Sequence, residues 1–161
     1  QTMKTKIIQR AFLKIIILLC VSFLALAACS KKHAAFKDLN GQTIHFSQLR
    51  GRWIILNYWA SWCENCVHEF SALNTFYQVN RHKNVMLFGV NYDGLDAAAQ
   101  KVALKKFNLQ YPLLLTDPAS VLGLPAVVVL PTTFVINPQG KLVATRLGTQ
   151  TLESLTAAIK D

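Results

Sequence analysis

The sequence predicts an α/β fold in which helices flank a central mixed β-sheet, with an N-terminal β-hairpin and a helix–strand insertion in the middle. Near-continuous apolar runs at 53–59 and 85–91 are typical of strands buried on both faces. Apolar residues recur at helical spacing between 70 and 80. Helical and strand-like segments alternate, which favours a layered domain. The 161 residues suit one such domain rather than two.

The first elements are a hairpin and a buried strand. Phe36–Phe46 is predicted to form the hairpin, because Asn40-Gly41 between strand-like segments is typical of a tight turn. A connector over 47–51 leads to the buried strand Trp53–Trp59. The amphipathic helix after this strand is expected to end near Asn80.

The middle of the chain adds a second buried strand and the insertion. Val85–Asn91 is predicted to be the strand. Asp96–Phe107 is predicted to be a helix in which Asp96 is the N-cap, and Leu113–Leu115 a short strand.

The last third holds an apolar stretch, two strands and a helix. We interpret Val121–Leu130 as core, with an apolar docking surface as the alternative. Thr132–Ile136 and Leu142–Arg146 are the predicted strands, joined by a turn at 137–140, and a closing helix begins near Thr151.

The N-terminus has the layout of a secretory signal. Basic residues precede an apolar run, Ile15–Ala28, whose 14 residues fall short of the roughly 20 needed to cross a bilayer. Cleavage is therefore favoured over a permanent span. The predicted division is a signal over 1–28, a polar tether over 29–35 and one domain over 36–161.

A lipidation signal closes the apolar run. Leu26-Ala27-Ala28 before Cys29 resembles the lipobox of bacterial lipoproteins, in which the cysteine thiol receives a diacylglyceryl group. We therefore expect Cys29 to be lipidated and the protein to be anchored to a membrane, facing the periplasm.

Two cysteines remain for redox chemistry. Of the four in the chain, Cys20 would leave with the signal and Cys29 would carry lipid, so Cys63 and Cys66 are the remaining thiols. In an oxidising compartment such a pair is either a structural staple or a working redox couple. Their position between a buried strand and a helix favours the couple, because the helix N-terminus stabilises the thiolate of Cys63 while Cys66 is shielded one turn further on.

Charge and histidine content exclude other classes of function. Four of the seventeen basic residues lie in the signal, which leaves thirteen against eight acidic residues. This mildly basic, scattered charge suits an anionic membrane face and argues against nucleic-acid binding. The four histidines are scattered and support no metal site. No cofactor is expected beyond a redox-active Cys63–Cys66 disulfide.

Several motifs together resemble the thioredoxin superfamily, and more closely its TlpA/ResA group of membrane-tethered, extracytoplasmic proteins. The resemblance covers nearly all of residues 36–161 and implies a thioredoxin fold. The matching motifs are Asn40-Gly41, Leu49-Arg50-Gly51, the segment 57–66 (NYWASWCENC), Asp117-Pro118 and the segment 131–136 (PTTFVI).

The resemblance assigns roles to further residues. It implies that Pro131 is cis and faces the redox pair, so that a substrate strand pairs with the backbone before it. It also implies that Glu69, three residues after Cys66, accepts a proton from that thiol. The alternative is an exposed glutamate that favours the helix dipole. The expected substrate-binding residues are Trp62, Glu64, Asn65, Leu130, Pro131 and Thr132.

The chain departs from the family pattern at three places. Asn65 replaces the proline common before the second cysteine, and Ser71 stands where a helix-breaking proline is frequent. The apolar segment 121–130 lacks the tyrosine-containing helix usual before the cis-proline. The first two departures leave the redox potential open.

The expected function is that of a lipid-anchored thiol-disulfide oxidoreductase that reduces specific protein disulfides, for example in cytochrome c maturation. Glu64 beside Cys63 disfavours its thiolate, which makes the couple less oxidising. The protein is expected to be monomeric and to receive electrons from a membrane protein. The alternatives are a disulfide oxidase or isomerase, and a copper-binding lipoprotein whose two cysteines are soft-metal ligands.

Overall fold

The structure, a computed structural model, describes residues 35–160. The signal, the lipobox, Cys29 and the tether up to residue 34 lie outside the described residues. Strand β1 begins at Ala35, next to the expected start of the domain at Phe36. Within residues 35–160, none of the helices is both long and apolar enough to span a membrane.

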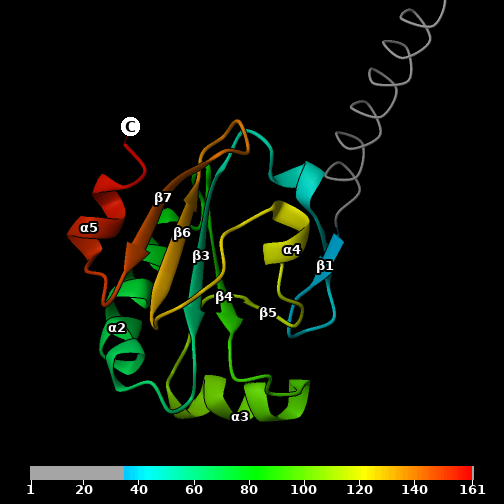
Figure 1. The fold of residues 1–161 in the computed structure, drawn as a ribbon, viewed down its shortest axis with the longest axis vertical. Helices are drawn as coiled ribbons and strands as arrows, with labels where there is room; N and C mark the ends of the chain where they lie inside the picture. The colour runs from blue at the N-terminus through cyan, green and yellow to red at the C-terminus, as the bar shows by residue number, and fades with distance from the viewer. Residues whose placement is uncertain (1–34, 161) are drawn as a thin grey trace, which may run out of the picture.

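The core of the fold is a mixed sheet in the strand order β5-β4-β3-β6-β7 (Figure 1). Strands β3, β4 and β5 are parallel, whereas β6 is antiparallel to β3 and β7 is antiparallel to β6. This confirms the predicted mixed sheet. The strand bounds are Trp53–Trp59 (β3), Val85–Asn91 (β4), Leu113–Leu114 (β5), Thr132–Ile136 (β6) and Leu142–Leu147 (β7).

The central strand β3 is buried on both faces, which explains its continuous apolar run. Ile55 and Trp59 pack into one core cluster, and Ile54, Leu56 and Tyr58 pack into a second cluster on the opposite face. Successive side chains of a strand point to opposite faces, so each cluster receives every second residue.

Helices supply most of the cover for the first face. Helix α2 (Glu64–Asn80) packs beside α5 (Leu152–Ala157), and α3 (Ala97–Lys106) adds Ala103 to the same cluster. The predicted cap of α3 is confirmed, because the Asp96 carboxylate accepts a hydrogen bond from the backbone N–H of Ala99 at 2.8 Å.

The second face is covered by the hairpin and a short helix rather than by a long helix (Figure 1). The hairpin pairs β1 (Ala35–Lys37) with β2 (Thr43–His45), and the helix is α4 (Ala119–Leu122). The hairpin loop is longer than a two-residue turn, because Lys37 pairs with Thr43. Within the loop, Asp38 Oδ1 accepts hydrogen bonds from the backbone N–H groups of Asn40 and Gln42.

The core interpretation of the apolar segment Val121–Leu130 is wrong for three of its valines. Leu122 is buried and Val127 is half-buried, but Val128 is 86% exposed. Helix α4 ends at Leu122, and the following residues cross the sheet without joining it, so one side of the segment faces solvent. The exposed valines are Val121, Val128 and Val129.

The topology brings three chain segments together at one edge of the sheet. Parallel strands β3 and β4 both end there, with Trp59 paired to Asn91. Strand β6 runs the opposite way and begins there, with Thr132 paired to Tyr58. The loops after β3 and β4 and the loop before β6 therefore meet at this edge, which is where the two cysteines lie.

Candidate active site

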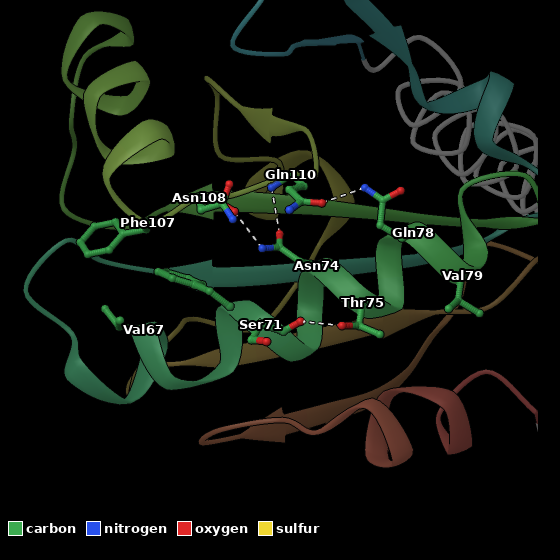
Figure 2. A pocket seen from close by; sticks show the side chains of 10 residues that line it. Val67, Ser71, Asn74, Thr75, Gln78, Val79, Phe107, Asn108 and Gln110 are labelled. Atoms are coloured by element: carbon green, nitrogen blue, oxygen red, sulfur yellow. Dashed lines mark hydrogen bonds between the residues drawn. The ribbon is translucent and has the colours of Figure 1, made fainter.

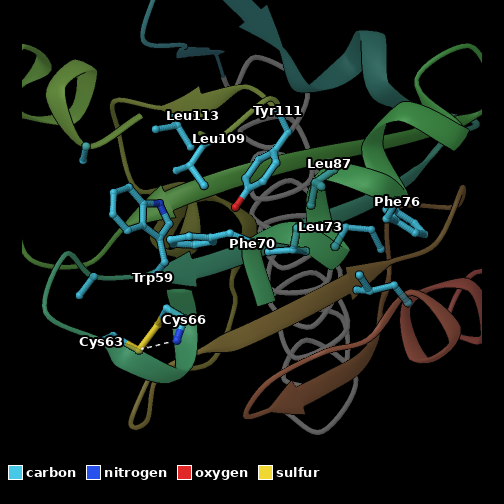
Figure 3. Packing of buried hydrophobic residues seen from close by; sticks show 14 of the residues in the cluster. Trp59, Cys63, Cys66, Phe70, Leu73, Phe76, Leu87, Leu109, Tyr111 and Leu113 are labelled. Carbon is cyan, nitrogen blue, oxygen red and sulfur yellow. Dashed lines mark hydrogen bonds between the residues drawn. A yellow bond between two sulfur atoms is a disulfide. The ribbon is translucent and has the colours of Figure 1, made fainter. Parts of the chain in front are cut away.

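Cys63 and Cys66 lie at the junction between β3 and α2, and their sulfur atoms form a disulfide (Figure 3). Cys63 is the N-cap of α2, and its sulfur accepts a hydrogen bond from the backbone N–H of Cys66 at 3.1 Å. When the bond is reduced, this N–H group and the helix dipole favour a thiolate on Cys63.

The two cysteines differ in their access to solvent. Cys66 has no exposed surface, whereas Cys63 is 6% exposed and follows Trp62, whose indole is 69% exposed. Glu64 and Asn65 between the cysteines are also exposed. A partner sulfur can therefore approach Cys63 past these three residues, while Cys66 lies behind it against the core (Figure 3).

The loop before Cys63 is held by Asp93, which follows β4. The Asp93 carboxylate accepts hydrogen bonds from the Ser61 backbone N–H at 2.9 Å and from the Ser61 hydroxyl at 2.6 Å. Partial burial acts to raise the pKa of Asp93, but hydrogen bonds from Ser61, together with those from Asn91 and the Asp93 backbone, outweigh it, and the pKa is lowered. Sequence reasoning missed Asp93, although an acid two residues after a buried parallel strand is a usable signal.

The predicted cis peptide bond at Pro131 is present, between Leu130 and Pro131. The Pro131 carbonyl accepts a hydrogen bond from the Gly148 N–H at 2.8 Å. The next residue, Thr149, donates from its hydroxyl to the Asn65 carbonyl at 3.3 Å, which ties this loop to the Cys-x-x-Cys segment. Pro131 is buried and Leu130 is half-buried.

Thr132, the last of the expected substrate-binding residues, is buried. Its hydroxyl donates to the Val129 carbonyl at 2.7 Å, which fixes the chain just before the cis bond. The expected residues thus come from two segments at one edge of the sheet, residues 62–65 at the start of α2 and residues 130–132 at the start of β6.

Glu69 is a fully buried carboxyl group, and the alternative of an exposed glutamate is wrong. Its Oε1 accepts a hydrogen bond from Asn57 Nδ2 at 2.6 Å, and its Oε2 accepts one from the Gln150 backbone N–H at 2.8 Å. Burial raises the pKa of Glu69 to about 7 by removing water from the charged form, although both hydrogen bonds act to lower it. One helical turn separates Glu69 from Cys66 on the same stripe of α2.

Sequence reasoning missed the partners of Glu69. Asn57 is the one amide side chain in the apolar and aromatic run Trp53–Trp59, and that was an available signal. Gln150 gave no such signal in the sequence, because it contributes a backbone N–H group and not its side chain. Tyr111 also lies fully buried near Glu69, and burial, with a smaller contribution from the Glu69 charge, raises its pKa well above the usual value.

A groove of about 500 Å³ lies elsewhere, between the outer face of α2 and the segment after α3 (Figure 2). Amide side chains cross it: Asn74 donates to the Asn108 carbonyl, and Gln78 donates to Gln110. Neither cysteine lines this groove, so it is not the redox site. Over residues 35–160, no three or more His, Cys, Asp or Glu side chains gather where they could hold a metal ion.

Comparison with known proteins identifies a family for this chain. Residues 29–145 match the AhpC/TSA family. The chain is 36% identical over 119 residues to thiol-disulfide oxidoreductase ResA of Bacillus subtilis strain 168, a match that covers 71% of this chain and 64% of the relative. It is 31% identical over 123 residues to the protein of the same name from Bacillus anthracis, covering 76% of this chain and 70% of the relative.

Solved structures agree with the fold. The crystal structure of StoA from Bacillus subtilis matches with a TM-score of 0.66 and 25% identity, covering 78% of this chain and 94% of that chain. A thioredoxin-family thiol:disulfide interchange protein from Chlorobium tepidum TLS matches with a TM-score of 0.69. At 18% identity, over 79% of this chain and 90% of that chain, the latter match shows the fold alone.

Proposed function

Because this chain belongs to the AhpC/TSA family of thioredoxin-fold redox enzymes, we propose that it catalyses thiol–disulfide exchange with protein substrates through Cys63 and Cys66. One observation carries the proposal: the disulfide has its less buried cysteine at the N-cap of α2 and its fully buried cysteine one turn further into the helix. The name that the curated relatives share supports the same reaction class.

In the reducing direction, the thiolate of Cys63 attacks one sulfur of a substrate disulfide. The substrate S–S bond breaks, a mixed disulfide forms, and the released substrate thiolate takes up a proton. Cys66, as a thiolate, then attacks the sulfur of Cys63. The mixed disulfide breaks, the second substrate thiol leaves, and two electrons have passed from the protein dithiol to the substrate.

Glu69 has the right position to take the proton that Cys66 loses. A carboxyl group with a pKa near 7 is partly ionised at neutral pH, so it can accept a proton and release it again. Its burial one helical turn from Cys66 keeps bulk water from competing for this transfer. We assign Glu69 the role of proton acceptor for the resolving thiol.

The substrate is expected to lie across Trp62 and the backbone before Pro131. An extended segment can pair with that backbone and present its sulfur to Cys63. The exposed residues Trp62, Glu64 and Asn65 flank the approach. Exported cysteine-containing proteins, such as apocytochrome c before haem attachment, are the proposed substrates, with electrons supplied by a membrane protein.

The reducing direction gives the first testable prediction. Glu64 lies in the first turn of α2 beside Cys63, where its negative charge opposes the thiolate. The reduced form is therefore stabilised less than it would be beside a basic residue, and the couple is less oxidising. We expect a reduction potential nearer the roughly −270 mV of thioredoxin than the roughly −120 mV of DsbA. Equilibration of the purified protein with glutathione buffers, read by thiol alkylation, measures it.

The same measurement separates the alternatives. A potential near the oxidising end of this scale would favour a disulfide oxidase or isomerase. Reduction of insulin disulfides by the wild-type protein, with the double variant Cys63→Ser/Cys66→Ser as control, tests the activity itself. Tight Cu(I) binding by the reduced protein without any exchange activity would favour the copper-binding alternative.

We further propose that a lipid on Cys29 anchors the domain outside the cytoplasm as a monomer. The support is the lipobox and signal pattern of the sequence. Wild-type protein is expected in the membrane fraction, since several acyl chains give stable anchoring where one gives only marginal binding. Cys29→Ser should block lipid attachment and the cleavage coupled to it. Fractionation and mass spectrometry check this, and a freely soluble wild-type protein with an unmodified Cys29 would contradict it.

A further inference from the structure

The two oxygens of the Glu69 carboxyl group face different kinds of hydrogen-bond donor. Oε2 faces the backbone N–H of Gln150 at 2.8 Å, which is a fixed donor and cannot accept a proton. Oε1 faces the side-chain amide of Asn57 at 2.6 Å. A proton that Glu69 takes up on Oε1 would therefore lie on the side of Asn57.

The amide of Asn57 has an unused acceptor. Its Nδ2 donates to Glu69 and also to the Thr133 hydroxyl at 3.1 Å, whereas its Oδ1 is buried and has no hydrogen-bond partner in the described structure. An amide presents donors on one side and an acceptor on the other, and a hydroxyl can donate or accept. Asn57 and Thr133 can thus exchange their donor and acceptor roles without moving any backbone.

A proton on Oε1 of Glu69 favours such an exchange, although the exchange turns the Nδ2 amino group toward the buried position where Oδ1 has no partner. In the orientation present, a proton on Oε1 would set an O–H group against the N–H group of Asn57, and two donors do not bond. A half-turn of the amide about its terminal torsion brings Oδ1 to face Glu69. Oδ1 then accepts from both the Glu69 acid and the Thr133 hydroxyl. The 2.6 Å contact lies within the usual range of an O–H···O bond and just below that of an N–H···O bond.

We propose that Asn57 is a positioning residue that holds the Glu69 carboxyl group in both of its protonation states by reversing its side-chain amide. The ionised carboxylate accepts from Nδ2, and the protonated acid donates to Oδ1. The carboxyl group is thereby kept in one place beside Cys66 while a proton moves onto and off Oε1. This inference deepens the role proposed for Glu69, and its relevance to catalysis rests on the proposed function.

Of the groups near Glu69, Asn57 is the side chain whose hydrogen bonds change when Glu69 binds a proton. Tyr111 is fully buried, and its raised pKa keeps its hydroxyl protonated. Cys66 on α2 is held in the disulfide, and Glu153 on α5 is exposed. Arg146 on β7 lies beside Thr133 in the sheet, and no ion pair joins it to Glu69 within the described residues.

The test follows the side-chain amide of Asn57 by NMR in the oxidised protein, labelled with ¹⁵N-asparagine. In wild-type protein the two N–H resonances of the Asn57 side chain should shift with pH, and the midpoint of this shift should equal the midpoint of the Glu69 carboxyl titration. Glu69→Gln mimics the acid permanently, because its amide oxygen can accept from Gln150 and its NH₂ group can donate to Asn57 Oδ1. The Asn57 resonances of this variant at pH 9 should therefore match those of wild-type protein at low pH.

Two results would overturn the proposal. One is a set of Asn57 resonances that does not change as Glu69 titrates. The other is a rise of about one pH unit or more in the titration midpoint of Glu69 on Asn57→Leu, which is expected if Asn57 only donates to the carboxylate. If the amide bonds both forms of Glu69, the midpoint should rise by less. The spectra are recorded on the disulfide form, so neither result depends on exchange activity.

Discussion

Protein carrying Cys66→Ser is expected to accumulate as mixed disulfides with its partners through Cys63, whereas protein carrying Cys63→Ser is not. The asymmetry of the site gives the reason. Cys63 is the less buried of the two cysteines and the N-cap of α2, so it can meet a partner sulfur as a thiolate. Without Cys66 no thiol lies behind it to release the partner. Turnover should be abolished in both variants.

The measurement is a comparison of non-reducing gels and mass spectra after expression under oxidising conditions. The double variant Cys63→Ser/Cys66→Ser is the control for non-specific capture. In Cys63→Ser the remaining Cys66 has no exposed surface, so partners should not reach it. Equal trapping by the two single variants, or trapping by neither, would contradict the assignment of attacking and resolving thiols.

Local patterns were sufficient to predict most of the fold. The strands Trp53–Trp59 and Val85–Asn91 have the bounds that their apolar runs indicate. The cap formed by Asp96 was predictable because it spans three residues. By contrast, apolar composition alone could not separate buried from exposed positions in Val121–Leu130, since this segment forms no ladder that would impose a period of two.

The candidate site was predicted only in part, for a related reason. The cysteines lie in one short segment whose position at a strand–helix junction carries the chemistry. The environment of Glu69 is instead assembled from distant segments, and its bond to Gln150 spans 81 residues of sequence. Likewise the Ser61–Asp93 contact spans 32 residues and follows from the parallel pairing of β3 with β4. Such partners become visible only once the sheet order is known.

Glu69→Gln is expected to change the pH dependence of both the stability and the thiol chemistry. For stability, the pKa of Glu69 rises from its ordinary 4.5 to about 7 in the fold. The native state therefore holds this proton more tightly than the unfolded chain, and the associated stability is present below pH 4.5 and lost as pH rises through 7. The loss is on the order of 3 kcal/mol at most.

The glutamine variant lacks this titration. Its free energy of unfolding, measured by denaturant in the oxidised form, should increase relative to that of wild-type protein between about pH 5 and pH 8.5. This window brackets the shift in the Glu69 pKa. The opposite trend would show that Glu69 is stabilised as an anion in the fold, and would contradict a carboxyl group whose pKa is raised by burial.

For the thiol chemistry, an ionised Glu69 opposes a second negative charge on Cys66, so its removal should lower the apparent pKa of Cys66. It should also remove the inflection near neutral pH from the exchange rate, because the proton acceptor is lost. The comparison is sharpest in a Cys63→Ser background, where Cys66 is the single thiol of the redox pair and its alkylation rate can be followed against pH. Glutamate and glutamine proteins with superimposable alkylation curves would remove Glu69 from the mechanism, since a buried carboxyl group one turn from Cys66 cannot exchange protons with it and leave its titration unchanged.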